Sequence, residues 1–236
     1  MKYKIPTLSL LVPLLAAFLG LAALPALAQV PPSWSTYSSA DDPRLKDFGE
    51  LTARYPPWFT ATGAAEADSE AGRAAIDIAA GESKDGGHQY KLTAVIMKLT
   101  PETAQSLDKA NSEEIWRALG NDLRSDRAGA YSGTRPLLFK GLHAADMDQS
   151  SQNATRHEGD TPKKAVTVNR LVISGLRLYM GACTVFGMTE RETKFKGFSS
   201  RSIPTVSNIC TPFLNSLELG HHTGNRHRNS GPTFYY

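Results

Sequence analysis

The 236-residue sequence lacks most of the features that mark a specialised class of protein. Its two cysteines are too few for a disulfide-rich scaffold, and only 8% of its residues are aromatic. The 14 prolines and 19 glycines are scattered, which excludes a collagen-like or low-complexity chain. With 41% hydrophobic and 21% charged residues, the sequence is typical of a globular protein, and at roughly 100–200 residues per domain it predicts a single domain.

The sequence also lacks an excess of either charge. It has 26 basic and 23 acidic residues, and two of the basic ones, Lys2 and Lys4, lie in the first segment. Without that segment, 24 basic residues stand against 23 acidic ones. Electrostatic binding of a nucleic acid needs a concentrated positive surface, so this balance predicts that no nucleic acid is bound.

Residues 1–28 have the composition of a targeting segment. Two lysines precede the apolar stretch Leu8–Leu24, and small residues follow at Ala26 and Ala28. We therefore predict a signal peptide that is cleaved after Ala28, and a periplasmic or secreted chain with no stable membrane insertion afterwards. The alternative is an uncleaved anchor, but the apolar run is short for a span of about 20 residues and Pro13 interrupts it.

The two cysteines, Cys183 and Cys210, both lie beyond the signal segment. In an oxidising compartment an even pair predicts one disulfide, here closing a loop of about 28 residues. The alternative is two separate buried thiols, because a free cysteine packs as a small apolar side chain.

Apolar alternation predicts strands, and apolar spacing of three and four predicts helices. The expected strands cover residues 48–55, 74–80, 89–99, 137–143, 165–173 and 177–186, the last two joined as a hairpin at Ser174-Gly175. Thr100-Pro101-Glu102 predicts a helix start, and Ile115, Trp116, Leu119 and Leu123 form an apolar stripe further on. A last helix is expected from Pro204, with Gly220 as its stop.

Three segments show no such periodicity. Residues 29–47 are rich in proline, serine and aspartate and predict a flexible N-terminal arm. Residues 147–162 predict a long polar loop. This loop is expected after a turn at 133–136 and the strand at 137–143. Residues 220–236 predict a polar, flexible tail, so the folded domain is expected over 48–219. Strands, a helical insert, strands and a final helix in this order predict an α+β fold, an antiparallel sheet covered by helices.

Three stretches resemble the PsbP-like superfamily, an α/β/α sandwich shared by PsbP and a Ran-binding nuclear import factor. They are an early strand ending at a proline turn, Phe48–Pro57, the hairpin segment Arg170–Tyr179, and the closing segment Phe213–Leu219. The sequence departs from the family where Pro56-Pro57 stands in place of Pro-Gly, and where Leu217 replaces a phenylalanine. The resemblance implies this fold and a non-catalytic accessory or binding module with no cofactor.

The motifs of common enzyme classes are missing. The sequence contains no Gly-x-Ser-x-Gly, His-Glu-x-x-His, Walker loop or Gly-x-Gly-x-x-Gly. We therefore expect no catalytic residue, and a function in binding an unidentified protein or small-molecule partner.

One segment offers an alternative. His143, Asp146, Asp148, His157 and Glu158 carry imidazole and carboxylate groups that suit a divalent ion. The segment begins like a calcium-binding loop but lacks the required glycine and the final glutamate. The alternative function is a periplasmic, metal-assisted hydrolase that uses the loop from His143 to Glu158.

A second cluster combines basic and aromatic residues. Lys194, Lys196 and Arg201 alternate with Phe195 and Phe198, a pattern that also occurs where proteins contact nucleic acids or lipid headgroups. A solvated loop edge has the same composition, and we expect that simpler interpretation to hold.

Overall fold

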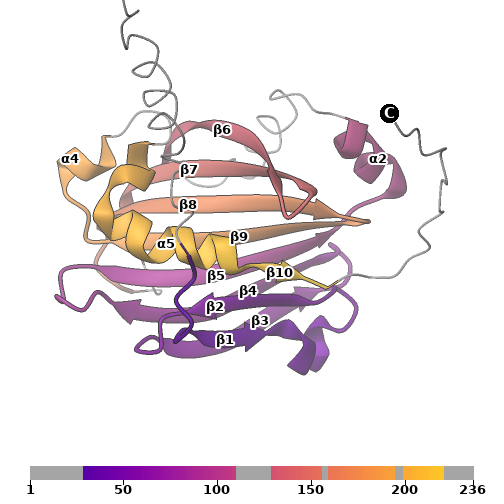
Figure 1. Ribbon diagram of the computed structural model, residues 1–236, viewed down its shortest axis with the longest axis horizontal. Helices are drawn as coiled ribbons and strands as arrows, with labels where there is room; N and C mark the ends of the chain where they lie inside the picture. Colours follow the sequence, from indigo (N-terminus) through magenta and orange to yellow (C-terminus); the bar gives the residue numbers. More distant parts are fainter. Residues whose placement is uncertain (1–28, 110–128, 156–158, 195–198, 221–236) are drawn as a thin grey trace, which may run out of the picture.

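The computed structural model describes residues 29–109, 129–155, 159–194 and 199–220 (Figure 1). The strands are β1 (Ser35–Ser38), β2 (Leu51–Tyr55), β3 (Thr60–Asp68), β4 (Arg73–Glu82), β5 (Gln89–Lys98), β6 (Gly129–Phe139), β7 (Leu142–Ala154), β8 (Lys163–Ser174), β9 (Arg177–Phe186) and β10 (Glu218–Leu219). The helices are η1 (Ser39–Asp41), η2 (Pro43–Leu45), α2 (Pro101–Lys109), α4 (Glu190–Thr193), η3 (Ser199–Ser202) and α5 (Pro204–Ser216).

Seven strands form one antiparallel sheet in the order β3-β4-β5-β9-β8-β7-β6. A small antiparallel sheet, β1-β2-β10, lies with α5 over one face of the large sheet (Figure 1). Helix α5 contacts β2 of the small sheet and β8 and β9 of the large one. The predicted α+β class with an antiparallel sheet is confirmed.

The main core lies between this covering layer and the large sheet. Its largest fully buried side chains include Phe48, Leu51, Tyr90, Leu92 and Phe213. A second cluster occupies the opposite face of the sheet and consists of Leu107 from α2 with Ala145, Met147, Leu171, Ile173 and Leu178. Both faces of the central strands are therefore apolar, which explains why their sequences show apolar residues at consecutive positions.

Strands β8 and β9 form the predicted hairpin. Ser174 pairs with Arg177, and Gly175 between them has φ = +58°, which glycine adopts without a steric penalty. The predicted disulfide is also confirmed, because Cys183 of β9 is bonded to Cys210 of α5. This bond holds the last helix against the middle of the large sheet.

Two further elements follow the sequence closely. Strand β5 occupies the range expected from its alternating apolar residues. Helix α2 begins at Pro101, and the Thr100 hydroxyl accepts a hydrogen bond from the Thr103 amide at 3.2 Å. The predicted second apolar stripe, which includes Trp116, lies outside the described residues, as do the signal segment 1–28 and the tail from 221 onward.

Residues 30–47 differ from the expected flexible arm. They contain β1, η1 and η2, and the side chains of Trp34 and Leu45 are buried. The Ser39 hydroxyl donates to the carbonyl oxygen of Gly49 at 3.3 Å and accepts from the Leu51 amide at 2.8 Å. Two apolar anchors and these hydrogen bonds hold a segment whose overall composition is typical of a loop.

The expected strand over 137–143 and the loop over 147–162 are also wrong. Strand β6 continues through Pro136, which an edge strand tolerates because its missing N–H faces no partner. The turn lies at Lys140 and Gly141, with φ of +51° and +79°, rather than at 133–136. Strand β7 then runs to Ala154, across the first half of the expected loop.

The last helix ends earlier than its spacing indicates. Helix α5 stops at Ser216, and Leu217 follows in an extended conformation. Glu218 and Leu219 form β10 by pairing with β2, and the Gly220 amide donates to the carbonyl oxygen of Glu50 at 2.9 Å. Pairing with β2, rather than a glycine cap at Gly220, therefore terminates the helix.

Candidate functional site

The two aspartates of the alternative metal site lie inside the protein. Asp146 and Asp148 project from β7 toward α5, and both are fully buried. Arg170 of β8 donates from Nε and Nη2 to the two oxygens of Asp146 at 2.8 and 3.1 Å. Arg201 of η3 donates from Nη1 to Asp146 at 2.8 Å and from Nη2 to Asp148 at 2.9 Å. We name these four residues the buried ionic cluster.

The buried ionic cluster connects the large sheet to the layer above it. The Ser200 hydroxyl of η3 donates to Asp148, and Nη2 of Arg135 on β6 donates to Asp146 at 3.0 Å. Nη1 of Arg170 donates to Oδ1 of Asn215 in α5 at 2.9 Å. The hydrogen-bonding groups of the cluster thus join β6, β7 and β8 to η3 and α5, which is a structural role.

The protonation of Asp146 reflects these contacts. Burial acts to raise the pKa of this carboxyl, but hydrogen bonds from Arg170 and the positive charge of Arg201 outweigh it, so the pKa is lowered. Asp146 is therefore ionised at neutral pH, and its charge is matched by guanidinium groups.

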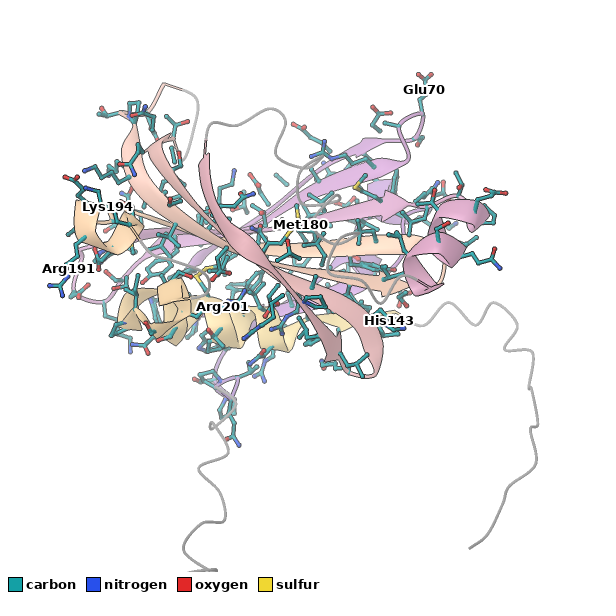
Figure 2. The ribbon with its side chains drawn as sticks, turned by 90° about the horizontal axis from the view of Figure 1, so that it is seen from above. Glu70, His143, Met180, Arg191, Lys194 and Arg201 are labelled. Carbon is teal, nitrogen blue, oxygen red and sulfur yellow. A yellow bond between two sulfur atoms is a disulfide. The ribbon has the colours of Figure 1, made fainter. Side chains whose placement is uncertain are left out.

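These contacts contradict the interpretation of the segment as a metal-binding loop. Carboxylates held by two buried arginines have no free oxygen for a cation, and the arginine charges repel one. His143 lies near the β6–β7 turn, well apart from Arg201 in Figure 2. Within the described ranges no three His, Cys, Asp or Glu residues are grouped as metal ligands, and His157 and Glu158 lie outside those ranges.

The basic residues between 194 and 201 were expected to form a solvated loop edge, which holds for Lys194 but not for Arg201. Arg201 points inward and is 13% exposed, whereas Lys194 lies on α4 at the end of the molecule (Figure 2). Lys194 is exposed and forms an ion pair with Glu190. Lys196, Phe195 and Phe198 lie outside the described residues.

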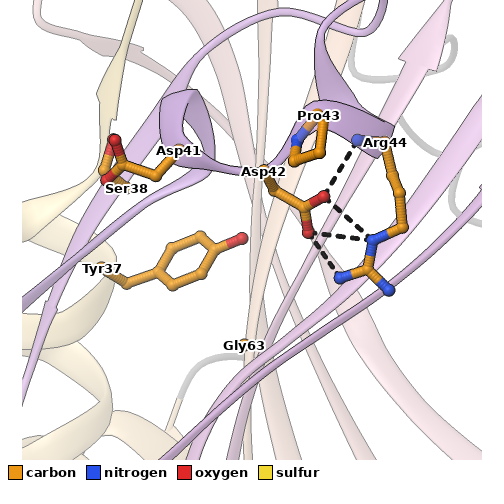
Figure 3. A pocket seen from close by; sticks show the side chains of 7 residues that line it. All are labelled: Tyr37, Ser38, Asp41, Asp42, Pro43, Arg44 and Gly63. Atoms are coloured by element: carbon orange, nitrogen blue, oxygen red, sulfur yellow. Dashed lines mark hydrogen bonds and ion pairs between the residues drawn. The ribbon is translucent and has the colours of Figure 1, made fainter.

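An open hollow of about 460 Å³ lies where the edges of the two sheets meet (Figure 3). Tyr37 and Ser38 belong to β1, an edge strand of the small sheet, and Gly63 belongs to β3, an edge strand of the large one. The remaining lining residues come from η1, η2 and the link between them: Asp41, Asp42, Pro43 and Arg44. We name this site the edge hollow.

The hydroxyl of Tyr37 has an unusual environment in the edge hollow. It is buried and has no hydrogen-bond partner. Among the described side chains, the only other buried polar atom without a partner is Nε of Arg177. Figure 3 shows the hydroxyl on the side of the ring that faces Asp42. Burial, followed by the negative charge of Asp42, raises the pKa of Tyr37 to about 12. A buried polar atom without a partner is unfavourable, so a ligand that supplies one gains free energy.

The charged groups of the edge hollow are partly neutralised. Arg44 donates from Nε and Nη2 to the Asp42 carboxylate, at 2.9 and 2.6 Å for the closest contacts, and the Arg44 amide donates to the same carboxylate at 2.9 Å. The hydrogen bonds from Arg44 hold the pKa of Asp42 below its usual range. Asp41 is exposed and forms no ion pair with the described residues, so the lining carries one net negative charge.

No sequence motif marks the edge hollow. Its residues lie in the segment expected to be a flexible arm and in a strand, β3, that was not expected at all. A hydroxyl without a partner is a property of the folded chain and has no counterpart in the sequence.

The described part of the chain contains no helix that is both long enough and apolar enough to span a bilayer. No protein-family model and no curated protein sequence matches the chain. A search of solved structures returns the Ran-binding protein Mog1p of Saccharomyces cerevisiae, with 12% identity and a TM-score of 0.44 over 79% of this chain and 95% of that one. It also returns the cyanobacterial PsbP of Synechocystis, with 11% identity and a TM-score of 0.39 over 86% of this chain and 99% of that one.

A Bacteroides thetaiotaomicron structure is also returned, with 11% identity and a TM-score of 0.32 over 73% of this chain and 46% of that one. At these identities and TM-scores the likenesses carry no conclusion about a ligand or a partner of this chain.

Proposed function

We propose that the chain is an exported, non-catalytic binding or accessory module that holds a partner at the edge hollow. The observation that carries this proposal is the Tyr37 hydroxyl, which is buried without a partner at the wall of an open, charged site. The buried ionic cluster supports the proposal indirectly. Its carboxylates and guanidinium groups are engaged in holding the fold, so they do not serve a partner.

Export is supported by the segment 1–28 and by the disulfide. The basic, apolar and small-residue regions of that segment have the order of a secretory signal, and disulfides persist in oxidising compartments. We expect the exported protein to begin at Gln29, which N-terminal sequencing checks. A mature chain that retains residues 1–28 would instead indicate an anchor.

Site-specific photo-crosslinking tests the binding site. The crosslinking residue replaces Pro43, which is exposed and lines the edge hollow, and in a matched control it replaces Arg191, which is exposed on α4. The turns η1 and η2 lie at the opposite corner of the molecule from α4 (Figure 1). Irradiation of cells that export each variant is expected to give a discrete adduct from position 43 and none from position 191. Equal adducts at both positions, or none at position 43, would refute the proposal.

A further inference from the structure

Strand β3 presents an open edge next to the hollow. It is the first strand in the order of the large sheet, and it pairs only with β4. Among the described residues no backbone hydrogen bond joins its outer edge to another element. Such an edge exposes a row of N–H and C=O groups that match an added, extended chain.

The edge of β3 lacks lysine and proline, two of the features that proteins use to block strand addition, although it has a bulge and two acidic side chains. The opposite edge strand, β6, contains Arg135 and Pro136, whereas β3 has the sequence Thr-Ala-Thr-Gly-Ala-Ala-Glu-Ala-Asp, without lysine or proline. Its side chains are small and mostly exposed, and Ala65 alone is buried. A bulge lies between Ala61 and Ala64, and the five residues from Ala64 to Asp68 pair in regular register.

The bulge in β3 lies beside the edge hollow. Gly63 lies within it, has φ = +56° and lines the hollow. A Cβ atom placed on Gly63 would have no other atom within 4 Å, so there is free space beside the backbone at this point. A chain added along β3 therefore passes the mouth of the hollow.

The charges along this edge are mainly acidic. Glu66 and Asp68 are exposed on β3, and Asp41 is exposed in the hollow. Asp42 is matched by Arg44, and no other basic residue lines the hollow. An added chain with basic side chains is favoured by this charge distribution.

We infer that the edge of β3 binds an extended, basic segment of a partner protein as an additional strand, and that one Lys or Arg side chain of this segment enters the edge hollow between Asp41 and Asp42. This inference rests on the proposed function. Main-chain hydrogen bonds to β3 supply affinity, and the hollow supplies specificity, as in other cases of strand addition.

A random twelve-residue peptide library panned on the oxidised chain tests the inference. The enriched peptides are expected to carry Lys or Arg at alternate positions. Bound to the isotope-labelled chain, such a peptide is expected to shift the amide resonances of residues 60–68 and 37–44. Because alternate amides of an added strand point away from β3, N-methylation of one alternate set should abolish binding, and methylation of the other set should leave it intact.

A pair of matched variants tests the charge of the hollow. Asp41→Lys, inside the hollow, is expected to lower the affinity for the enriched peptide about tenfold or more, and a tenfold change corresponds to about 1.4 kcal/mol. Asp47→Lys makes the same change of net charge at an exposed residue that does not line the hollow, and it is expected to change the affinity less than twofold.

Four results would overturn the inference: no enriched peptide, equal loss from both methylated sets, a self-association of the chain through β3, or equal effects of the two lysine variants. The proposed function fails separately. It is refuted if crosslinking gives no adduct at position 43 or equal adducts at positions 43 and 191. A ligand that shifts the amide resonances of residues 37–44 but not those of 60–68 would keep the binding site and refute strand addition alone.

Discussion

In the part of the chain that the structure describes, aspartate and arginine form ion pairs in two places, and the two places differ in what surrounds them. In the buried ionic cluster, Arg170 and Arg201 are 7% and 13% exposed and hold carboxylates that solvent does not reach. In the edge hollow, Arg44 is 54% exposed and holds Asp42 beside a buried hydroxyl that has no partner. The same pair of side chains lies in the interior in one case and lines an open surface hollow in the other.

The difference has a physical basis in solvation. Removing one member of a buried pair leaves the other charge without water or a partner, which is strongly unfavourable. In the edge hollow the Asp42 side chain is 14% exposed but the Arg44 side chain is 54% exposed, so solvent screens this pair more and its net effect on stability is smaller. The four predictions that follow test this contrast, from the largest expected effect to the smallest.

The largest effect is expected from Asp146→Asn. The variant leaves Arg170 and Arg201 without their shared carboxylate and is expected to lower the free energy of unfolding by about 3–5 kcal/mol. Chemical denaturation monitored by circular dichroism measures it. Asp42→Asn is the matched control and should leave the denaturation midpoint unchanged. Equal loss in both variants would remove the distinction between the two sites.

The disulfide lies on the same side of the sheet as the buried ionic cluster. Replacing both cysteines, Cys183→Ala with Cys210→Ala, is expected to lower stability by about 3–4 kcal/mol, because the bond closes a loop with a sequence separation of 27. A thiol assay of the denatured, unreduced protein should detect no thiol and should detect two after reduction. Two thiols before reduction would contradict the bridge.

Acid should destabilise the buried ionic cluster through the protonation of Asp146. The pKa of Asp146 is lowered in the folded chain by Arg170 and Arg201 against the effect of burial. Its contribution to stability is therefore complete above the ordinary aspartate pKa of about 3.9 and is lost as the pH falls through the lower, folded value. Denaturation midpoints between pH 7 and pH 2 should decline less steeply in Asp146→Asn than in the parent chain.

The smallest effect at neutral pH is expected from Tyr37→Phe. Its hydroxyl forms no hydrogen bond, so the variant should keep its free energy of unfolding at pH 7. The control Tyr90→Phe loses a hydrogen bond to the Thr205 carbonyl oxygen, and its free energy of unfolding should fall by about 1 kcal/mol. The pKa of Tyr37 is raised to about 12, so its contribution is present below about pH 10 and lost as the pH rises through 12. Tyr37→Phe should therefore reduce alkaline destabilisation. A large loss at pH 7 would mean that the hydroxyl has a partner.

Local signals predicted the parts of the fold that depend on neighbouring residues. Turn chemistry at Ser174-Gly175 predicted the hairpin, and the capping signal at Thr100-Pro101 predicted the helix start. The even pair of cysteines, in a chain expected to be exported, predicted the disulfide. Strand β3 was missed because its alanines, threonines and glycine have no apolar alternation, and pairing with β4 forms it.

The sites could not be predicted because they depend on distant partners. Asp146 and Asp148 look like loop residues until Arg170 and Arg201, far along the chain, are placed beside them. The edge hollow combines residues 37–44 with Gly63 across two sheets. In both cases the function of a side chain is set by its pairing, and pairing between distant residues leaves no local pattern.

The small sheet has a consequence for the order in which the chain folds. Its middle strand, β2, pairs on one side with β1, nearby in sequence, and on the other with β10, so Leu51 is paired with Leu219. The second pairing closes a very long loop, and contacts of high sequence separation form slowly. During synthesis one edge of β2 stays unpaired until almost all of the domain has emerged, and exposed strand edges of this kind are prone to aggregate. We therefore expect the completion of this sheet to be a late step of folding, and the interval before it to be the period when the chain most needs a chaperone.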